Sequence, residues 1–248
     1  MIGESKIQEI QYHRRNSVLV HGGVSLQRTI DEFFTYQPIV RVDMRSVNSR
    51  VFVYQQTVIM KRIFDMLFSS LVLIVGFPVF LVLALVTKIS SPGPVFYKQQ
   101  RIGKEGRPFY IYKFRSMHVN AEKYGPQLAS DNDPRVTRWG RFMRRSHLDE
   151  LPQFWNVLKG EMAVVGPRPE REFFVNEIVR KAPEYRKLFR IKPGITSIGQ
   201  VTYGYAETVD QMCDRMAFDL SYLARMSLRT DLSIIFQTVR VMAQGKGK

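Results

Sequence analysis

Two adjacent carboxylates, Asp149 and Glu150, are the residues of this chain best suited to chemistry. They stand just before Pro152, where apolar residues begin to recur every three or four positions, so we expect them in the first turn of a helix. The free amides and the dipole of a helix N-terminus stabilise negative charge and attract phosphate oxygens. Four guanidiniums lie just upstream, at Arg138, Arg141, Arg144 and Arg145.

Two carboxylates beside phosphate-binding groups suit phosphoryl transfer, in which positioning and charge neutralisation carry most of the catalysis. One carboxylate could attack phosphorus while the other holds a metal ion. The simpler interpretation is structural, because acidic residues are ordinary in a first helical turn and the nearby arginines would then only pair with them.

Further candidate phosphate ligands lie on either side of this pair. Pro167-Arg168-Pro169 is a rigid turn that fixes the direction of one guanidinium, a group that binds phosphate through two hydrogen bonds. Lys113 and Arg115 alternate with aromatic residues on an expected strand, which would turn both toward a substrate phosphate. A solvated turn and a solvated strand face explain the same two patterns.

Metal-binding and nucleotide-binding motifs are weak elsewhere. Asp131-Asn132-Asp133 has the Asp-x-Asp spacing of metal-dependent glycosyltransferases, but it precedes a proline in a polar stretch, which favours a turn. The four histidines have no metal-ligand spacing. The chain has no P-loop, dinucleotide fingerprint or nucleophile elbow.

Periodicity predicts an α+β fold that is mainly α with short β-hairpins. Apolar residues at three- and four-residue steps predict helices over 135–143, 148–158, 170–190 with a break at Pro183, and 211–242 as two helices. Aromatic-rich segments predict a β-hairpin from 95–97 and 109–114, and short strands at 17–24, 51–54 and 195–201.

The last helix has one apolar face, which would dock on the core or lie at a membrane surface. That face consists of Leu232, Ile235, Phe236, Val239 and Met242.

A run of twenty-two residues without a charged side chain extends from Met66 to Thr87. As a helix it would be about 30 Å long, enough to cross a bilayer. Pro78 should kink or break it, and basic residues, which mark the cytoplasmic side, flank both ends: Lys61 and Arg62 before it and Lys88 after it. These features favour a re-entrant helix over a kinked spanning helix or a buried helix of a soluble protein.

Charge and cysteine content limit the partners and the compartment. The 37 Lys and Arg exceed the 22 Asp and Glu by 15, so the surface attracts phosphates of anionic lipids, nucleotides or nucleic acid. Nucleic acid is disfavoured because the chain has no binding module and no long Lys/Arg tract. A single cysteine, Cys213, excludes an internal disulfide, and the N-terminus lacks the pattern of a cleaved signal peptide. We therefore expect the polar part in the cytoplasm.

Taken in order, the motifs resemble the bacterial sugar transferase family, the monotopic polyprenyl-phosphate phosphoglycosyl transferases, over residues 58–248. They are Lys61-Arg62-Ile63-Phe64-Asp65, Gly93-Pro94-Val95-Phe96-Tyr97, Arg101-Ile102-Gly103, Tyr112-Lys113-Phe114-Arg115-Ser116-Met117, Asp133-Pro134-Arg135-Val136-Thr137, Leu148-Asp149-Glu150-Leu151-Pro152-Gln153, Asn156-Val157-Leu158-Lys159-Gly160, Val165-Gly166-Pro167-Arg168-Pro169 and Lys192-Pro193-Gly194-Ile195-Thr196.

The resemblance implies a reaction in two steps. Asp149 would attack the sugar-bearing phosphate of a UDP-sugar, expelling UMP and keeping a covalent phosphosugar. A polyprenol phosphate such as undecaprenyl phosphate would then take the phosphosugar, starting an exopolysaccharide, capsule, O-antigen or glycoprotein glycan. Glu150 resembles the Mg²⁺ ligand. The implied substrate-binding residues are Lys113, Arg115, Arg144, Arg145, Pro167, Arg168, Pro169 and Lys192.

The resemblance also implies an organisation and a location. Residues 1–57 would be an extension of unknown role, 58–91 a re-entrant membrane helix anchored at Lys61, Arg62 and Pro78, and 92–248 a catalytic domain at the cytoplasmic face of the bacterial inner membrane. Ser197 departs from the family pattern, which has glycine there. A homodimer and downstream glycosyltransferases are conceivable partners. The alternative is a basic, membrane-anchored scaffold without catalysis.

Overall fold

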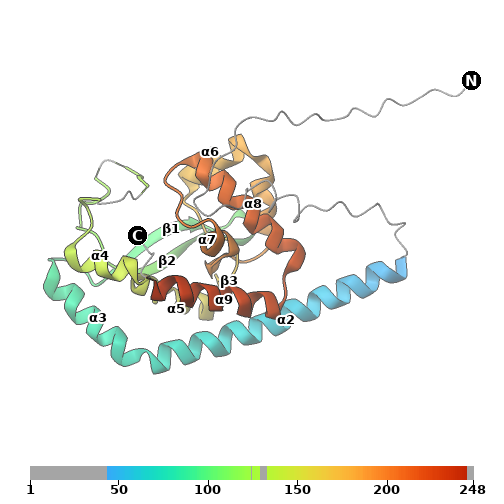
Figure 1. The fold of residues 1–248 in the computed structure, drawn as a ribbon, viewed down its shortest axis with the longest axis horizontal. Helices are drawn as coiled ribbons and strands as arrows, with labels where there is room; N and C mark the ends of the chain where they lie inside the picture. Colours follow the sequence, from blue (N-terminus) through green and yellow to red (C-terminus); the bar gives the residue numbers. More distant parts are fainter. Residues whose placement is uncertain (1–43, 124, 129–132, 245–248) are drawn as a thin grey trace, which may run out of the picture. The chain divides into compact units, whose positions relative to one another are not determined.

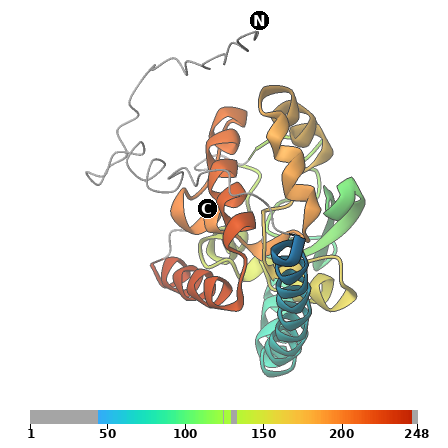
Figure 2. The ribbon, with the colours of Figure 1, turned by 90° about the vertical axis from the view of Figure 1, so that its right-hand side faces the viewer.

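The structure is a computed structural model that describes residues 44–123, 125–128 and 133–244, with side chains from position 56 onward. The strand expected at 17–24 and most of the expected N-terminal extension lie outside the described residues. Within them the fold is α+β, mainly helical with a few short strands (Figures 1 and 2).

The chain enters the described region as one long helix, α2, from Met44 to Val75. The strand predicted at 51–54 is therefore wrong, and the helix runs across the boundary expected at position 57. Helix formation is cooperative, so a long helix anchored farther along the chain propagates through a short stretch of β-favouring residues.

A second helix, α3 (Phe77–Ser90), follows α2 after a bend of 62° at Gly76. Pro78 lies in the first turn of α3, where its missing N–H costs nothing but prevents α2 from continuing. No single helix among the described residues is long and apolar enough to cross a membrane. Together the bent pair Gln56–Val75 and Phe77–Ser90 meets that criterion by length and composition.

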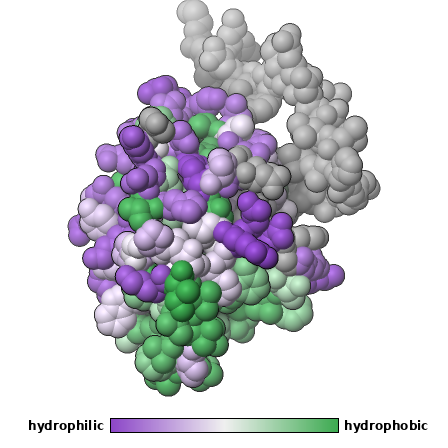
Figure 3. Space-filling model, turned by 90° about the vertical axis from the view of Figure 1, so that its left-hand side faces the viewer, coloured by the Kyte–Doolittle hydropathy of each residue, from purple (hydrophilic) through white to green (hydrophobic). Residues whose placement is uncertain are grey.

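The outer face of the bent pair is apolar and exposed, and it forms the hydrophobic end of the molecule in Figure 3. Leu71, Ile74, Phe77 and Leu85 are all more than half exposed. A contiguous exposed apolar surface of this kind marks a site of contact with another protein or with a membrane.

Both ends of the bent pair are bound to the rest of the chain. Near its start, Lys61 forms a buried ion pair with Asp231 of helix α9 (Leu228–Ala243). Arg62 donates to Val157 O and Leu158 O at the end of helix α5 (Gln153–Lys159). The two flanking cations are thus bound within the protein.

At the far end, Arg115 donates to Pro92 O at 2.8 Å and to Ser91 O at 2.7 Å. The indole of Trp139 donates to the Thr87 hydroxyl at 3.1 Å. Both ends of the bent pair therefore stay with one body of protein.

The predicted β-hairpin is confirmed: β1 (Phe96–Ile102) pairs antiparallel with β2 (Pro108–Phe114). A smaller parallel pair, β3 (Ala163–Val165) with β4 (Gly194–Thr196), was not predicted. The strand expected over 195–201 ends at Thr196, because the Ser197 hydroxyl accepts from Gln200 N and starts a short helix.

The remaining helices surround these strands (Figure 1). They are α4 (Arg138–Arg145), α5 (Gln153–Lys159), α6 (Glu172–Lys181), a 3₁₀ helix (Pro183–Arg190), α7 (Ile198–Thr202), α8 (Val209–Arg225) and α9 (Leu228–Ala243). The helix predicted over 148–158 ends at Lys159, just before Gly160. The break predicted at Pro183 is also present. Gly160 has φ 84°, the left-handed conformation that suits glycine after a helix.

Helix α9 docks through a different face from the apolar one that its sequence suggests. Its buried positions are Asp231 and Ile234, while Leu232, Phe236 and Val239 are 54%, 72% and 58% exposed. Asp231 can be buried because Lys61 and the Tyr222 hydroxyl both donate to its carboxylate.

Candidate active site

Asp149 and Glu150 lie in a 3₁₀ turn, Leu148–Glu150, just ahead of α5. The expected helix is therefore divided, with α5 beginning only at Gln153, after Pro152. His147 precedes the turn in the left-handed conformation, φ 55°, which reverses the chain as it leaves α4. A non-glycine residue with this backbone is uncommon, and such residues concentrate at functional sites.

The Glu150 carboxylate is 6% exposed and is held by two cations from distant segments. Lys113 Nζ of β2 lies 2.6 Å from Glu150 Oε1, and Arg168 Nη2 of the Pro-Arg-Pro turn lies 3.2 Å from the same oxygen. Burial raises the pKa of Glu150, but Lys113 and Arg168 outweigh it and hold the pKa well below its usual range. Glu150 is therefore ionised.

Asp149 has a different environment although it is equally buried. Its carboxyl accepts no hydrogen bond from the described residues. Burial raises its pKa, as does the charge of Glu150, against the opposing charges of Lys113 and Arg144. A carboxylate without donors is less stabilised and more nucleophilic once ionised, so Asp149 is better suited than Glu150 to act as a nucleophile.

Arg168 is held in place by both its turn and its contacts. Although burial alone would lower its pKa, Glu150 raises it, so the guanidinium keeps its charge. The backbone carbonyls on either side are bonded too: Pro167 O accepts from Gly194 N, and Pro169 O accepts from Arg101 Nη1. The two prolines thus fix Arg168 and need not contact a substrate themselves.

A carboxylate directly after this turn, Glu170, binds two further arginines. Its oxygens accept from Arg101 Nη1 at 3.2 Å and from Arg215 Nη2 at 2.5 Å. Sequence reasoning did not select these residues as a cluster, since Arg215 comes from α8, far along the chain. The stacking of the His147 and Tyr205 rings, 6.2 Å apart, was missed as well, because Tyr205 lies far from His147 along the chain.

Three of the residues predicted to bind phosphate do not contact the Asp149–Glu150 pair. The guanidinium of Arg115 binds the carbonyls at the end of α3. Arg145 is exposed on α4. Lys192 lies beside Arg62 near Gly160, and burial, together with the charge of Arg62, lowers its pKa. Arg144 does lie on the Asp149 side.

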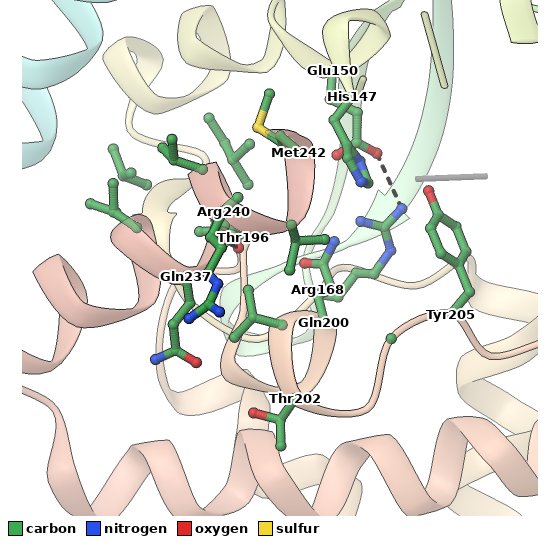
Figure 4. A pocket seen from close by; sticks show the side chains of 18 of the residues that line it. His147, Glu150, Arg168, Thr196, Gln200, Thr202, Tyr205, Gln237, Arg240 and Met242 are labelled. Atoms are coloured by element: carbon green, nitrogen blue, oxygen red, sulfur yellow. Dashed lines mark hydrogen bonds and ion pairs between the residues drawn. The ribbon is translucent and has the colours of Figure 1, made fainter. Parts of the chain in front are cut away.

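Two cavities meet at the carboxylate pair. The smaller, about 280 Å³, lies beside the hairpin and is lined by Lys113, Arg144 and Asp149. The larger, about 730 Å³, lies among α2, α5, α7 and α9 (Figure 4). Glu150 and Arg168 line both, so a substrate in either cavity reaches the same ion pair.

No cluster of three or more His, Cys, Asp or Glu side chains that could hold a metal lies among the described residues. Asp133 binds Arg135 with both oxygens, and Asp131 lies outside the described residues. Both contacts of Glu150 use Oε1, and Oε2 accepts no hydrogen bond from the described residues. One or two carboxylates suit Mg²⁺, which takes its other ligands from phosphates and water.

Comparison with known proteins supports the resemblance. Residues 54–245 match the profile of the family described as bacterial sugar transferase. UDP-N-acetylgalactosamine-undecaprenyl-phosphate N-acetylgalactosaminephosphotransferase of Aeromonas hydrophila is 43% identical over 187 residues, 75% of this chain and 44% of that protein. UDP-glucose:undecaprenyl-phosphate glucose-1-phosphate transferase of Escherichia coli (strain K12) is 44% identical over 184 residues, 73% of this chain and 39% of that protein.

The chain thus spans less than half the length of these two relatives. A shorter relative, the exopolysaccharide production protein PSS of Rhizobium leguminosarum bv. phaseoli, is 39% identical over 199 residues, 76% of this chain and 98% of that protein. Because the profile matches most of its length, the chain belongs to the bacterial sugar transferase family.

Proposed function

We propose that this protein transfers a sugar 1-phosphate from a UDP-sugar to a polyprenol phosphate such as undecaprenyl phosphate and releases UMP. The observation that carries the proposal is the difference in contacts between the two buried carboxylates, Asp149 and Glu150. Glu150 binds Lys113 and Arg168, while the neighbouring Asp149 carboxyl accepts no hydrogen bond from the described residues and lines a cavity. The names of the relatives support this reaction class.

In the first step an Asp149 oxygen attacks the sugar-bearing β-phosphorus of the donor. The bond between that phosphorus and the bridging oxygen breaks, and the bridging oxygen leaves with UMP. Lys113, Arg144 and Arg168 offset the charge of the diphosphate. The product is an acyl phosphate that keeps the sugar on Asp149.

In the second step a phosphate oxygen of the polyprenol phosphate attacks the same phosphorus, from the side that UMP has left. The bond from phosphorus to Asp149 breaks, and the carboxylate is regenerated. Splitting the reaction in this way lets a soluble donor and a lipid acceptor use one set of phosphate-binding groups in turn.

Glu150 Oε2 is the group that would hold Mg²⁺, which when bound would neutralise diphosphate charge. Its other ligands would be phosphate oxygens and water. The basic side chains Lys113, Arg144 and Arg168 would then orient the phosphates.

We also propose that the bent pair α2–α3 is re-entrant and holds the site at the cytoplasmic face of the bacterial inner membrane. The support is that both ends of the pair bind the same body of protein, through Lys61 and Asp231 at one end and Arg115 at the other. A spanning arrangement would break one of these sets of contacts. The exposed apolar face between them suits the acyl chains.

The first prediction concerns Asp149 and is tested with a panel of UDP-sugars, Mg²⁺ and no acceptor. The wild-type protein is expected to release one UMP per active site and to carry a phosphosugar on the peptide that contains Asp149. Asp149→Asn is expected to release no UMP above background, because its amide is not a nucleophile. Mass spectrometry of the trapped protein locates the adduct.

Asp133→Asn is the matched control, since it changes an equally small buried carboxylate outside the pair and is expected to keep the burst. Release of UDP instead of UMP, or a full UMP burst from Asp149→Asn, would contradict the proposal. Vesicle flotation of both variants checks that the fold and the membrane contact remain.

A further inference from the structure

We propose that the larger cavity, among α2, α5, α7 and α9, is the acceptor site, and that it takes the polyprenyl phosphate with its isoprenoid chain along α2 and α9. This inference rests on the proposed function and adds to it where the lipid substrate lies. Its volume of about 730 Å³ is in the range of cavities that enclose a substantial part of a ligand.

The lining of this cavity is divided in the way that an amphipathic lipid requires. Phe68 and Val72 of α2, Phe154 of α5, and Ile235 and Val239 of α9 supply an apolar wall. The end nearest the carboxylate pair is polar instead. It is formed by His147, Glu150, Arg168, Gln200 and Tyr205, which Figure 4 shows around the ion pair of Glu150 with Arg168.

The polar end has hydrogen-bond donors that are available to a phosphate. Arg168 gives one donor, on Nη2, to Glu150 at 3.2 Å, and a guanidinium has five. Gln200 also lines this end, and its side-chain nitrogen Nε2 donates no hydrogen bond to the described residues, so it can donate to a phosphate oxygen.

The two cavities suit different parts of the two substrates: the nucleotide of the donor and the isoprenoid chain of the acceptor. The incoming acceptor oxygen must attack phosphorus from the side that UMP has left, so both phosphates must lie near the residues common to the two cavities, which include Glu150 and Arg168. The smaller cavity is lined by Lys113, Arg144 and the hairpin and suits a nucleotide. The larger cavity then remains for the isoprenoid chain.

The apolar end also lies where a lipid can reach it. Phe68 and Val72 come just before the bend, and their neighbours Leu67 and Leu71 are 68% and 58% exposed on the apolar outer face of α2. An isoprenoid chain can therefore pass from that face into the cavity without crossing water. This continuity favours a membrane lipid over a soluble ligand.

Two substitutions on α9 distinguish lipid binding in this cavity from a general contact of α9 with the lipid surface. Val239→Asp puts a charge in the apolar wall. Leu232→Asp makes the same kind of change two helical turns earlier, at a residue that is 54% exposed compared with 58% for Val239 and that does not line the cavity. The acceptor-free UMP burst of each variant reports the fold and the donor site.

We expect Val239→Asp to keep the burst and to raise the KM for undecaprenyl phosphate at least tenfold. Geranyl phosphate, whose chain is too short to fill the apolar wall, should show a much smaller change. Leu232→Asp is expected to have the wild-type KM for both acceptors. Gln200→Leu should raise the KM for both, because both have the same phosphate.

An equal rise in KM for Val239→Asp and Leu232→Asp would overturn the inference, since it would mean that α9 only touches the lipid surface. Loss of the burst in Val239→Asp alone would overturn it too, because the cavity would then serve the donor. Absence of any burst in the wild-type protein is a distinct result that would remove the proposed function itself.

Discussion

Asp149 and Glu150 are neighbours in the chain, and their different contacts give them different chemistry. Residue types alone single out the pair, and the Pro-Arg-Pro turn points to Arg168. The sequence cannot show which carboxylate binds the cations, because Lys113 and Arg168 come from segments on either side of the pair. Arg115 has the residue type of a phosphate ligand, but the carbonyl groups at the end of α3 bind it instead.

Another buried carboxylate, Asp219, lies beside Ser197 and the turn that holds Arg168. The backbone N–H of Gly199, at 2.9 Å, and that of Arg168 donate to Asp219, as does the Ser197 hydroxyl. Asp219 thereby connects α8 to the turn that holds Arg168. Ser197 has φ −138°, an ordinary extended backbone that does not require glycine.

The stability of the fold should depend on the protonation of Asp219. Burial raises the pKa of Asp219 from 3.8 to about 6. Between these values the folded state holds a proton that the unfolded state has lost, so unfolding free energy falls as pH rises from about 4 to 6 and then levels off. Two pKa units correspond to about 3 kcal/mol.

Urea unfolding of the wild-type protein and of Asp219→Asn across this pH range measures the effect. The difference in unfolding free energy between the two should shift in favour of the variant by up to about 3 kcal/mol. A difference that stays constant with pH would contradict the prediction. Comparison with the variant cancels the pH dependence of the other carboxylates.

At the scale of elements, periodicity predicted the hairpin and most helices, and it failed where tertiary contacts decide. The segment 51–54 favours a strand locally but belongs to α2. Strand β3 has three residues, too few for a pattern to emerge, and β4 is only the start of the strand predicted over 195–201. The apolar stripe of α9 left open whether that face docks on the core; it stays largely exposed, and a charged residue, Asp231, is buried next to α2 instead.

The ion pair between Lys61 and Asp231 should be essential to the packing of α2 on α9. Lys61 is 8% exposed and Asp231 is fully buried. Lys61→Met leaves the Asp231 charge without its partner, which typically costs about 3–5 kcal/mol of unfolding free energy. Equilibrium denaturation in detergent micelles measures this loss.

The double variant Lys61→Met with Asp231→Leu is the informative comparison. It removes both charges and should recover most of the loss, because two apolar side chains can replace a buried ion pair. Equal instability of the single and double variants would show that the contact acts through something other than charge.

At the scale of the whole molecule, the proposed re-entrant arrangement puts both ends of the bent pair on the cytoplasmic side. Gln56, the first residue of the pair, and Gln100, which follows the pair, are both exposed. With Cys213→Ser as the background, Gln56→Cys and Gln100→Cys should both react with a membrane-impermeant maleimide from the cytoplasmic side only. Labelling of the two positions from opposite sides would indicate a spanning helix.

The attachment of both helix ends to one body of protein has a consequence for lipid dependence. In the proposed re-entrant arrangement, the protein fixes the depth to which the bend enters the bilayer, and only one leaflet is involved. A spanning helix must match the thickness of the hydrocarbon core, whereas this arrangement need not. Turnover in reconstituted vesicles is therefore expected to change little with acyl-chain length and to respond instead to how tightly the cytoplasmic leaflet is packed.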